Sequence, residues 1–305
     1  MRIPIFLSFM VSCFSVRAQT DLDAIMMSKN NFCGGIMYNQ SSWTNYWEGM
    51  FKRDNRNIGQ FSSRMTGIMG NYGASGKLNI LFSMPYVSNR VSAGTLIGRQ
   101  GLQDLSLFVK YMPVEKTWGP GTFSLYAIGG ISIPVSNYVA DYLPLSIGLR
   151  SRTATLRLMT DCQIGHWFAT LSGSYVFRDN IRIDRNAYYT TEMHYTNEVF
   201  MPNGVSANFR TGYRSNKLIA ELLVDNWTTL GGFDIRKNDM PFPSNRMNMT
   251  RAGINVKYTF KKPAGLSLIA GGDYVLQGRN VGQASAFHGG VFYIFDLSAK
   301  KKKKK

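Results

Sequence analysis

The sequence predicts an all-β protein, an antiparallel transmembrane β-barrel of about 12 strands within a range of about 10 to 14. Three observations predict it: a leader-like N-terminus, long segments in which apolar and polar residues alternate, and connections that are alternately short and long. The composition agrees, because only 17% of the 305 residues are charged, against about 25% in ordinary soluble domains. No run of about 18 apolar residues follows the first 20, so membrane-spanning helices are not predicted.

The N-terminus has the three parts of an export signal. Arg2 precedes a short apolar stretch, and Val16-Arg17-Ala18 places small residues before a cut at Gln19. The stretch is too short to span a bilayer, so residues 1–18 are predicted to be a signal peptide. Cys13 offers an alternative lipoprotein site, but the usual leucine is missing. The exported chain keeps Cys33 and Cys162, which we expect to be separate thiols rather than a disulfide.

The C-terminus carries most of the excess positive charge. Of the formal net charge of +17, six charges lie in Lys300–Lys305 and two in the leader, which leaves +9 for the rest. No aromatic residue interleaves the lysines, so residues 298–305 are predicted to be a solvated tail rather than a nucleic-acid-binding arm.

Period-two alternation predicts the strands. In residues 153–164, Leu156 and Leu158 share one face with other apolar residues, whereas Arg157 and Asp161 share the other. Helical spacing fits this pattern poorly. A strand of this kind suits a soluble sandwich or a lipid-facing barrel, and the lengths decide, because membrane-crossing strands need about 9 to 11 residues. The twelve predicted strands are 43–53, 58–72, 76–88, 101–113, 122–134, 152–164, 167–178, 204–214, 217–228, 249–261, 265–276 and 285–297.

The connections favour a barrel over a sandwich. Short turns follow the second, sixth, eighth and tenth strands, and long loops follow the third, fifth, seventh and ninth. Outer-membrane barrels have short periplasmic turns and long outer loops, and an even strand number places both termini in the periplasm. Aromatic residues near strand ends fit the membrane interface, although core packing is an alternative. They are Trp43, Tyr46, Trp47, Tyr111, Trp167, Phe177, Trp227, Tyr258 and Phe260.

If the apolar faces meet lipid, the polar faces line a lumen. Basic and acidic groups are nearly balanced on these faces, so we expect paired charges in a narrow lumen, with structural pairing favoured over a role in solute binding. The predicted lumen-lining residues are Glu48, Arg64, Asp104, Lys110, Arg157, Asp161, Arg210, Glu221, Asp225, Arg251, Lys257, Asp273 and Asp296.

Two further segments are predicted to shape the opening. Loop 178–204 carries aromatic residues that either form a constriction or pack on neighbouring loops. The constriction candidates are Tyr188, Tyr189, Tyr195 and Phe200. Residues 19–42, before the first predicted strand, are compatible with a plug, a periplasmic strap or a further strand pair.

The sequence shows no catalytic constellation. His166, His194 and His288 lie far apart, and no paired Cys, G-x-S-x-G or phosphate-loop motif occurs. No catalytic residue, cofactor or metal site is therefore predicted, and the protein is not expected to be an enzyme. An outer-membrane hydrolase, as the distant alternative, requires a Ser–His pair at the barrel rim.

One stretch resembles a known family. Tyr72-Gly73, then Met84-Pro85-Tyr86-Val87, then Gly101-Leu102-Gln103-Asp104 with Lys110-Tyr111 resemble outer-membrane proteins of the "MetA-pathway of phenol degradation" transporter family over about residues 60–135. Segments 43–49, 240–245 and 289–293 also look like outer-membrane proteins of Bacteroidetes-type bacteria. The resemblance implies a barrel that passes small hydrophobic or aromatic compounds, and it supplies no site residue.

These observations predict an outer-membrane barrel, residues 43–297, that passes small solutes by passive diffusion. The alternative is a non-transporting structural barrel that anchors an envelope partner. Membrane lipid and a small hydrophobic solute are the expected partners, no nucleic acid is expected, and the sequence does not determine the oligomeric state.

Overall fold

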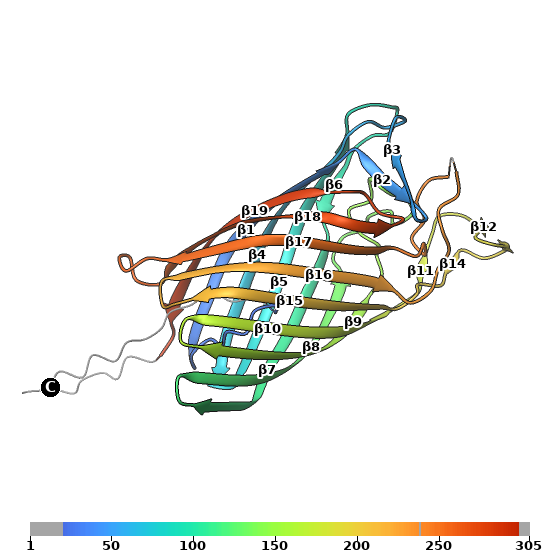
Figure 1. Cartoon of the computed structure of the whole chain (residues 1–305). Helices are drawn as coiled ribbons and strands as arrows, with labels where there is room; N and C mark the ends of the chain where they lie inside the picture. The colour runs from blue at the N-terminus through green and yellow to red at the C-terminus, as the bar shows by residue number, and fades with distance from the viewer. Residues whose placement is uncertain (1–20, 238, 299–305) are drawn as a thin grey trace, which may run out of the picture.

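The computed structural model describes residues 21–298 except residue 238, so the predicted signal peptide and most of the lysine tail lie outside the described residues. Twelve long strands form a tilted barrel (Figure 1). They are β1 (Asn31–Trp43), β4 (Phe61–Ser75), β5 (Leu78–Val91), β7 (Asp104–Trp118), β8 (Gly121–Pro134), β9 (Thr153–Ile164), β10 (Trp167–Arg178), β15 (Gly204–Arg214), β16 (Leu218–Thr229), β17 (Asn248–Thr259), β18 (Leu266–Arg279) and β19 (Ser285–Asp296).

The wall closes on itself through β1. This strand pairs antiparallel with β19 on one side and with β4 on the other, and every other long strand pairs with its sequence neighbour. Asn31 lies opposite Asp296, so the wall begins and ends at the same rim. The predicted closed antiparallel barrel of twelve strands is therefore confirmed. Closure removes the unpaired edges that an open sheet would present.

The prediction of the first strand, 43–53, is wrong. The first strand of the wall is β1, and residues 45–54 form a small hairpin beyond the wall, from β2 (Asn45–Glu48) and β3 (Phe51–Asp54). The alternation is weak in β1 because glycines and small polar residues replace large apolar ones. Gly35 is required there, since a Cβ would lie 2.3 Å from the Val291 carbonyl oxygen. The barrel thus begins at Asn31 rather than at residue 43.

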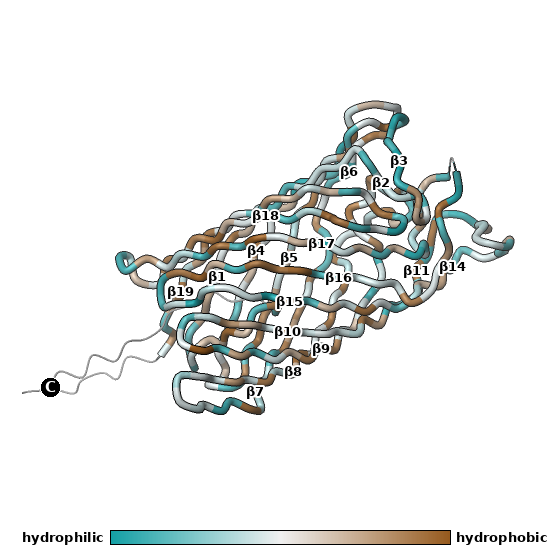
Figure 2. Tube along the Cα trace, viewed as in Figure 1, coloured by the Kyte–Doolittle hydropathy of each residue, from teal (hydrophilic) through white to brown (hydrophobic). Residues whose placement is uncertain are grey.

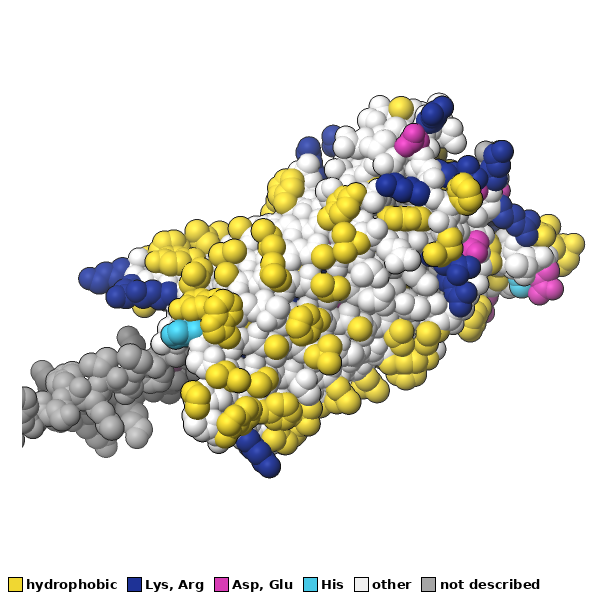
Figure 3. Space-filling model, in the orientation of Figure 1, with side chains coloured by type: hydrophobic (Ala, Val, Ile, Leu, Met, Phe, Trp, Pro, Cys, Tyr) yellow, Lys and Arg dark blue, Asp and Glu magenta, His cyan; other side chains and the backbone are white. Residues whose placement is uncertain are grey.

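The two faces of the strands differ as predicted. On β9, Leu158 is 65% exposed on the outer face, whereas Asp161 on the inner face is 5% exposed. Figure 2 shows apolar segments across the wall, and Figure 3 shows yellow side chains spread over its flank. An exposed apolar belt of this extent on a closed barrel faces lipid. The barrel therefore lies across an outer membrane.

Short turns join the strands at one end, which we call the turn end. Gly119 and Gly165 adopt positive φ in two of these turns, where a side chain would be strained. Exposed aromatic residues follow this rim, among them Trp118, Trp167 and Tyr258. Barrels of this class place their short turns in the periplasm. The described residues contain no helix long and apolar enough to cross a membrane.

Long loops gather at the other end, the loop end. They carry the small elements β6 (Arg99–Leu102), β11 (Ile181–Arg182), β12 (Tyr188–Tyr189), β13 (Met193–His194) and β14 (Glu198–Val199). The alternation of short and long connections is therefore as predicted. The predicted interface residue Trp47 lies here instead of at a strand end in lipid, and it is only 7% exposed.

Candidate functional site: the barrel lumen

Charged side chains on β15 to β18 form a continuous network on the inner wall. Arg210 pairs with Glu221 at 2.9 Å, and its Nε donates to Asn208 Oδ1 at 3.0 Å. Arg251 bridges Asp225 at 3.1 Å and Asp273 at 3.5 Å. These residues share a face because the strands alternate with period two and pair in register. Each charged group of the network has a partner of opposite charge, as expected for charges in a narrow lumen.

A second cluster lies nearer the turn end. The Arg214 guanidinium donates two hydrogen bonds to the Asp161 carboxylate, at 2.8 and 3.1 Å, and lies 3.8 Å from the centre of the Phe168 ring. Thr170 Oγ1 also donates to Asp161. Arg214 and Asp161 are both almost completely buried. Removing either partner would leave the other as an uncompensated buried charge.

The segment before β1, residues 21–30, lies inside the lumen. Lys110 Nζ of β7 donates to Asp23 Oδ1 at 3.2 Å and to the Asp23 carbonyl at 2.8 Å. Arg157 of β9 pairs with Asp21 at 2.8 Å. On the opposite wall, Met27 packs on residues of β18 and β19. Since these strands lie on opposite sides of the barrel, the segment fills the space between them.

One glycine permits this close approach. The Asn30 N–H donates to the Gly73 carbonyl at 2.8 Å, where the segment leaves the lumen and enters β1. A Cβ on Gly73 would lie 2.2 Å from the carbonyl oxygen of Ser28. The segment therefore follows the wall of β4 only because residue 73 has no side chain.

A cavity of about 300 Å³ remains between the segment and the wall. Its two sides differ: Met37, Met65 and Met69 of β1 and β4 line one side, whereas the other side combines Arg210, Arg251 and their acidic partners with Ile219 and Leu223 of β16. Methionine is a flexible side chain that adapts to irregular apolar shapes. Asn39 Oδ1, on the same strand as Met37, accepts no hydrogen bond within the described residues. The cavity thus offers both apolar and hydrogen-bonding contacts to a small guest.

Most of the predicted lumen-lining residues lie on the inner face. Asp104 lies on that face at the loop end, where Tyr138 Oη donates to its carboxylate at 2.6 Å. The remaining nine belong to the networks above or line the cavity: Lys110, Arg157, Asp161, Arg210, Glu221, Asp225, Arg251, Lys257 and Asp273.

Three predicted lumen residues lie elsewhere. Glu48 is in the β2–β3 hairpin beyond the wall, where it pairs with Arg53 at 2.9 Å. Arg64 is on the outer face of β4, because the inner and outer faces of this strand are the reverse of the predicted ones. Asp296 is exposed at the rim of the turn end, where its carboxylate accepts a hydrogen bond from the Ser298 N–H. Each prediction failed where the alternation is weak or the strand ends.

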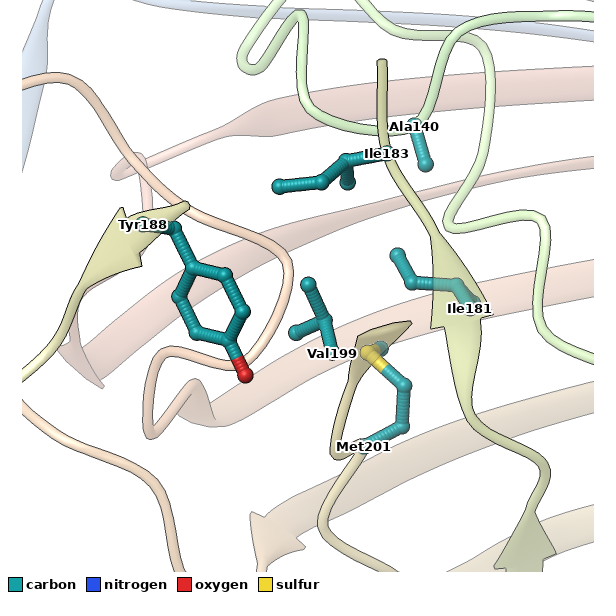
Figure 4. Packing of buried hydrophobic residues seen from close by; sticks show 6 residues of the cluster. All are labelled: Ala140, Ile181, Ile183, Tyr188, Val199 and Met201. Atoms are coloured by element: carbon teal, nitrogen blue, oxygen red, sulfur yellow. The ribbon is translucent and has the colours of Figure 1, made fainter. Parts of the chain in front are cut away.

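The aromatic residues of loop 178–204 separate into two groups. Tyr188 is buried in an apolar core between loops, where it packs with Ile181, Val199 and Met201 (Figure 4). Tyr189, Tyr195 and Phe200 are exposed, and Tyr195 is 86% exposed. The structure therefore shows a loop packed on its neighbours, in which Tyr188 is the one buried member of the four predicted constriction residues and Tyr189 contacts Arg236 of another loop.

Several residues of this site carry no pattern in the sequence that would select them. Asp21 and Asp23 carry no periodic signal, and Arg214 lies at a strand end beside a predicted turn. The methionines on β1 and β4 are separated by glycines, which hide the alternation. Only the ring closure places β1 and β4 on the same lumen as β15 to β18, with β19 between β1 and β18.

Hydrolytic chemistry finds no support among the described residues. The ring nitrogens of His194 and His288 meet Thr190 and Asn255, at 2.8 and 3.2 Å, rather than a serine. His166 packs against Tyr213. Among residues 21–298 other than 238, no group of acidic, histidine or cysteine side chains is placed to hold a metal ion. Cys33 and Cys162 are free thiols on β1 and β9.

Comparison with solved structures places the fold. The COG4313 outer membrane channel from Pseudomonas putida F1 superimposes with a TM-score of 0.69 at 14% identity, over 92% of this chain and 100% of that one. The chain has an outer-membrane barrel fold. Similarity is weaker to the translocator domain of autotransporter NalP from Neisseria meningitidis, with a TM-score of 0.46 at 11% identity over 90% of this chain and 91% of that one. The NanC porin superimposes with a TM-score of 0.45 at 9% identity, over 84% of this chain and 98% of that one. No family model matches the sequence. No curated protein matches it either.

Proposed function

We propose that this barrel is a passive outer-membrane channel for small solutes of largely apolar, aromatic character. The observation that carries the proposal is the two-sided cavity inside the barrel, with methionines facing a network of paired charges. Because Arg210 and Arg251 are each neutralised by wall carboxylates, the lumen holds no strong field that would select an ion. An apolar solute with one polar group matches both sides. No energy-coupling element is needed for diffusion down a gradient.

Passage through this cavity requires the N-terminal segment to move. Two ion pairs, a few hydrogen bonds and the burial of Ala24, Ile25 and Met27 against the wall hold residues 21–30 in the lumen, whereas the wall is held by its own strand ladders. Displacing the segment therefore leaves the wall intact. Because no strand ladder holds residues 21–30, we expect them to open locally at a lower free energy than the whole fold.

The test is conductance and solute flux of the refolded barrel in a planar bilayer and in liposomes. The variant D21N/D23N removes both anchoring charges, and we expect its mean conductance to rise several-fold over wild type. The matched control D54N/D239N removes two carboxylates from exposed loops and should behave as wild type. Equal conductance of the two variants, with heat-modifiable gel mobility showing that both fold, would contradict a role for the segment in closing the path.

Solute class is tested at the apolar side of the cavity. Influx of a labelled phenol into liposomes should fall several-fold in M65Q/M69Q, because polar side chains replace the apolar surface that the solute contacts. Influx of a small sugar should not fall. A variant that slows both solutes equally would indicate a simple obstruction.

A structural barrel is the second candidate, and the packed loop end favours it. Tyr188, Val199 and Met201 form an apolar core across the loops, as expected for a lid without a passage. A folded protein that neither conducts nor admits solute, even as D21N/D23N, would support this function and overturn the channel.

A further inference from the structure

A cleft of about 750 Å³ lies at the loop end, between residues 134–152 and residues 179–198. Three arginines line it: Arg150, Arg152 and Arg182. Its other polar lining residues are Ser136, Asn137, Asn180 and the two acidic residues Asp179 and Glu198. The function proposed above does not use this cleft.

Two of the arginines, Arg152 and Arg182, face outward, away from the lumen. Arg152 immediately precedes β9 and shares the face of the lipid-exposed Leu156 and Leu158, by the period of two. Arg182 lies between Ile181 and Ile183, both of which point into the apolar core of the loops (Figure 4). The Arg182 side chain therefore points away from this apolar core. In Figure 3, Lys and Arg side chains gather at this end of the barrel.

The cleft carries a net positive charge. Within residues 21–298 other than 238, none of the three guanidinium groups forms an ion pair. The Glu198 carboxylate already accepts a hydrogen bond from Asn180 Nδ2 at 2.9 Å. Three positive charges against two negative ones leave the cleft net positive. Arginine binds phosphate through paired N–H donors, so a phosphate is the fitting guest.

The backbone around the cleft is fixed in place. Arg150 has a φ of 57°, which a non-glycine residue adopts at a cost, and its N–H donates to Tyr138 Oη at 2.9 Å. Tyr138 donates in turn to Asp104 at the start of β7. The Asp179 N–H donates to the Arg152 carbonyl at 2.9 Å, which continues the β9–β10 ladder into the cleft. These contacts hold the backbone of Arg150 and Arg152 at the edge of the cleft.

The surface below the cleft is apolar. Ile131 and Ile133 of β8, Leu156 of β9 and Phe177 of β10 are exposed on the outer face. A ligand that fits both regions has an anionic head and hydrocarbon chains. We propose that this cleft binds the phosphate of an outer-leaflet lipid whose acyl chains lie along β8, β9 and β10. Basic clusters at a membrane boundary recognise anionic head groups in this way.

The test is native mass spectrometry of the detergent-solubilised barrel titrated with diphosphoryl lipid A, with phosphatidylcholine as the neutral lipid. We expect R150Q/R152Q/R182Q to bind lipid A roughly 100-fold more weakly than wild type, since each arginine near an anionic surface contributes about a factor of five. The matched control K52Q/R56Q/K237Q loses the same charge from loops outside the cleft and should bind as wild type. R152Q alone should bind lipid A about fivefold more weakly than wild type. This single variant provides the test if the triple variant does not fold.

Two further measurements distinguish lipid binding in this cleft from general attraction between opposite charges. D179N should bind lipid A more tightly than wild type, because a carboxylate beside the phosphate is removed. Inorganic phosphate at millimolar concentration should not displace the lipid, since it lacks acyl chains. Equal loss in the cleft and control variants, unchanged binding in R152Q, or full displacement by inorganic phosphate would each overturn the proposal.

Discussion

Inside the barrel, ion pairs to the wall and the buried side chains of Ala24, Ile25 and Met27 hold the N-terminal segment, whereas at the loop end an apolar core and a network of amides hold the loops over the opening. Lys110 and Arg157 anchor the segment through single ion pairs. Val199 and Met201 anchor the loops through contacts that exclude water. Ion pairs are lost when one partner changes charge, but an apolar core responds to volume. The two regions can therefore be perturbed separately.

The largest expected effect is on the buried pair near the turn end. D161A leaves the Arg214 guanidinium, which is 4% exposed, without its carboxylate, and we expect a loss of about 3–5 kcal/mol in the free energy of unfolding. The measurement is denaturant unfolding of the detergent-folded barrel, followed by gel mobility. D161A/R214M, which removes both charges, should recover most of the loss. Equal stability of D161A and wild type would show that the pair is solvated.

The second effect is on the loop end. Met201 is almost completely buried in the apolar core, so M201A is expected to destabilise the packed loops by about 2–5 kcal/mol. Because the barrel ladders do not depend on this core, gel mobility should be unchanged while proteolysis within loop 178–204 accelerates. F200A, which truncates an exposed neighbour, is the control and should change neither. Unfolding of the whole barrel in M201A would show that the two ends are coupled.

Asn280 joins three loops at the same end. Its Oδ1 accepts from the N–H groups of Gly49 (2.8 Å) and Ile235 (3.0 Å), and its Nδ2 donates to Asp234 (2.7 Å) and to the Arg246 carbonyl (2.8 Å). N280A is expected to cost about 1–3 kcal/mol in local opening, measured by hydrogen exchange. Asn280 has a φ of 54°, so N280G should cost about 1 kcal/mol less than N280A. Equal costs would assign the whole effect to the hydrogen bonds.

The smallest effect is a pH dependence of the same loops. The Arg279 guanidinium beside Asp234 lowers the pKa of that carboxyl, with Asn280 adding a further hydrogen bond. Because the pKa of Asp234 is lower in the folded state, its ionised carboxylate stabilises the loops at pH values above the ordinary carboxyl pKa of about 3.9. This stabilisation is lost as the pH falls through the lower pKa of the folded state. Proteolysis of loop 229–248 should therefore accelerate below about pH 4. D234N should remove that dependence, and a persistent acid response in D234N would assign it to another carboxylate.

Much of the wall could be predicted, and much of the site could not. Strands such as 153–164 follow from local alternation, because lipid on one side and a polar lumen on the other impose a period of two. β1 was misplaced because Gly34, Gly35 and its polar end carry little alternation, although closure requires the strand. Arg64 was placed on the wrong face for the same kind of reason, since a one-residue change of register moves every side chain to the other face.

The sequence by itself determined the class of the fold, eleven of the twelve wall strands, the alternation of turns and loops, and the near balance of charge on the inner faces. These follow from patterns within about a dozen neighbouring residues. Only the tertiary structure decided which charges meet, because Arg214 and Asp161 are 53 residues apart and Lys110 and Asp23 are 87 apart. Ring closure brings such residues together, and no local period encodes the distance across a barrel.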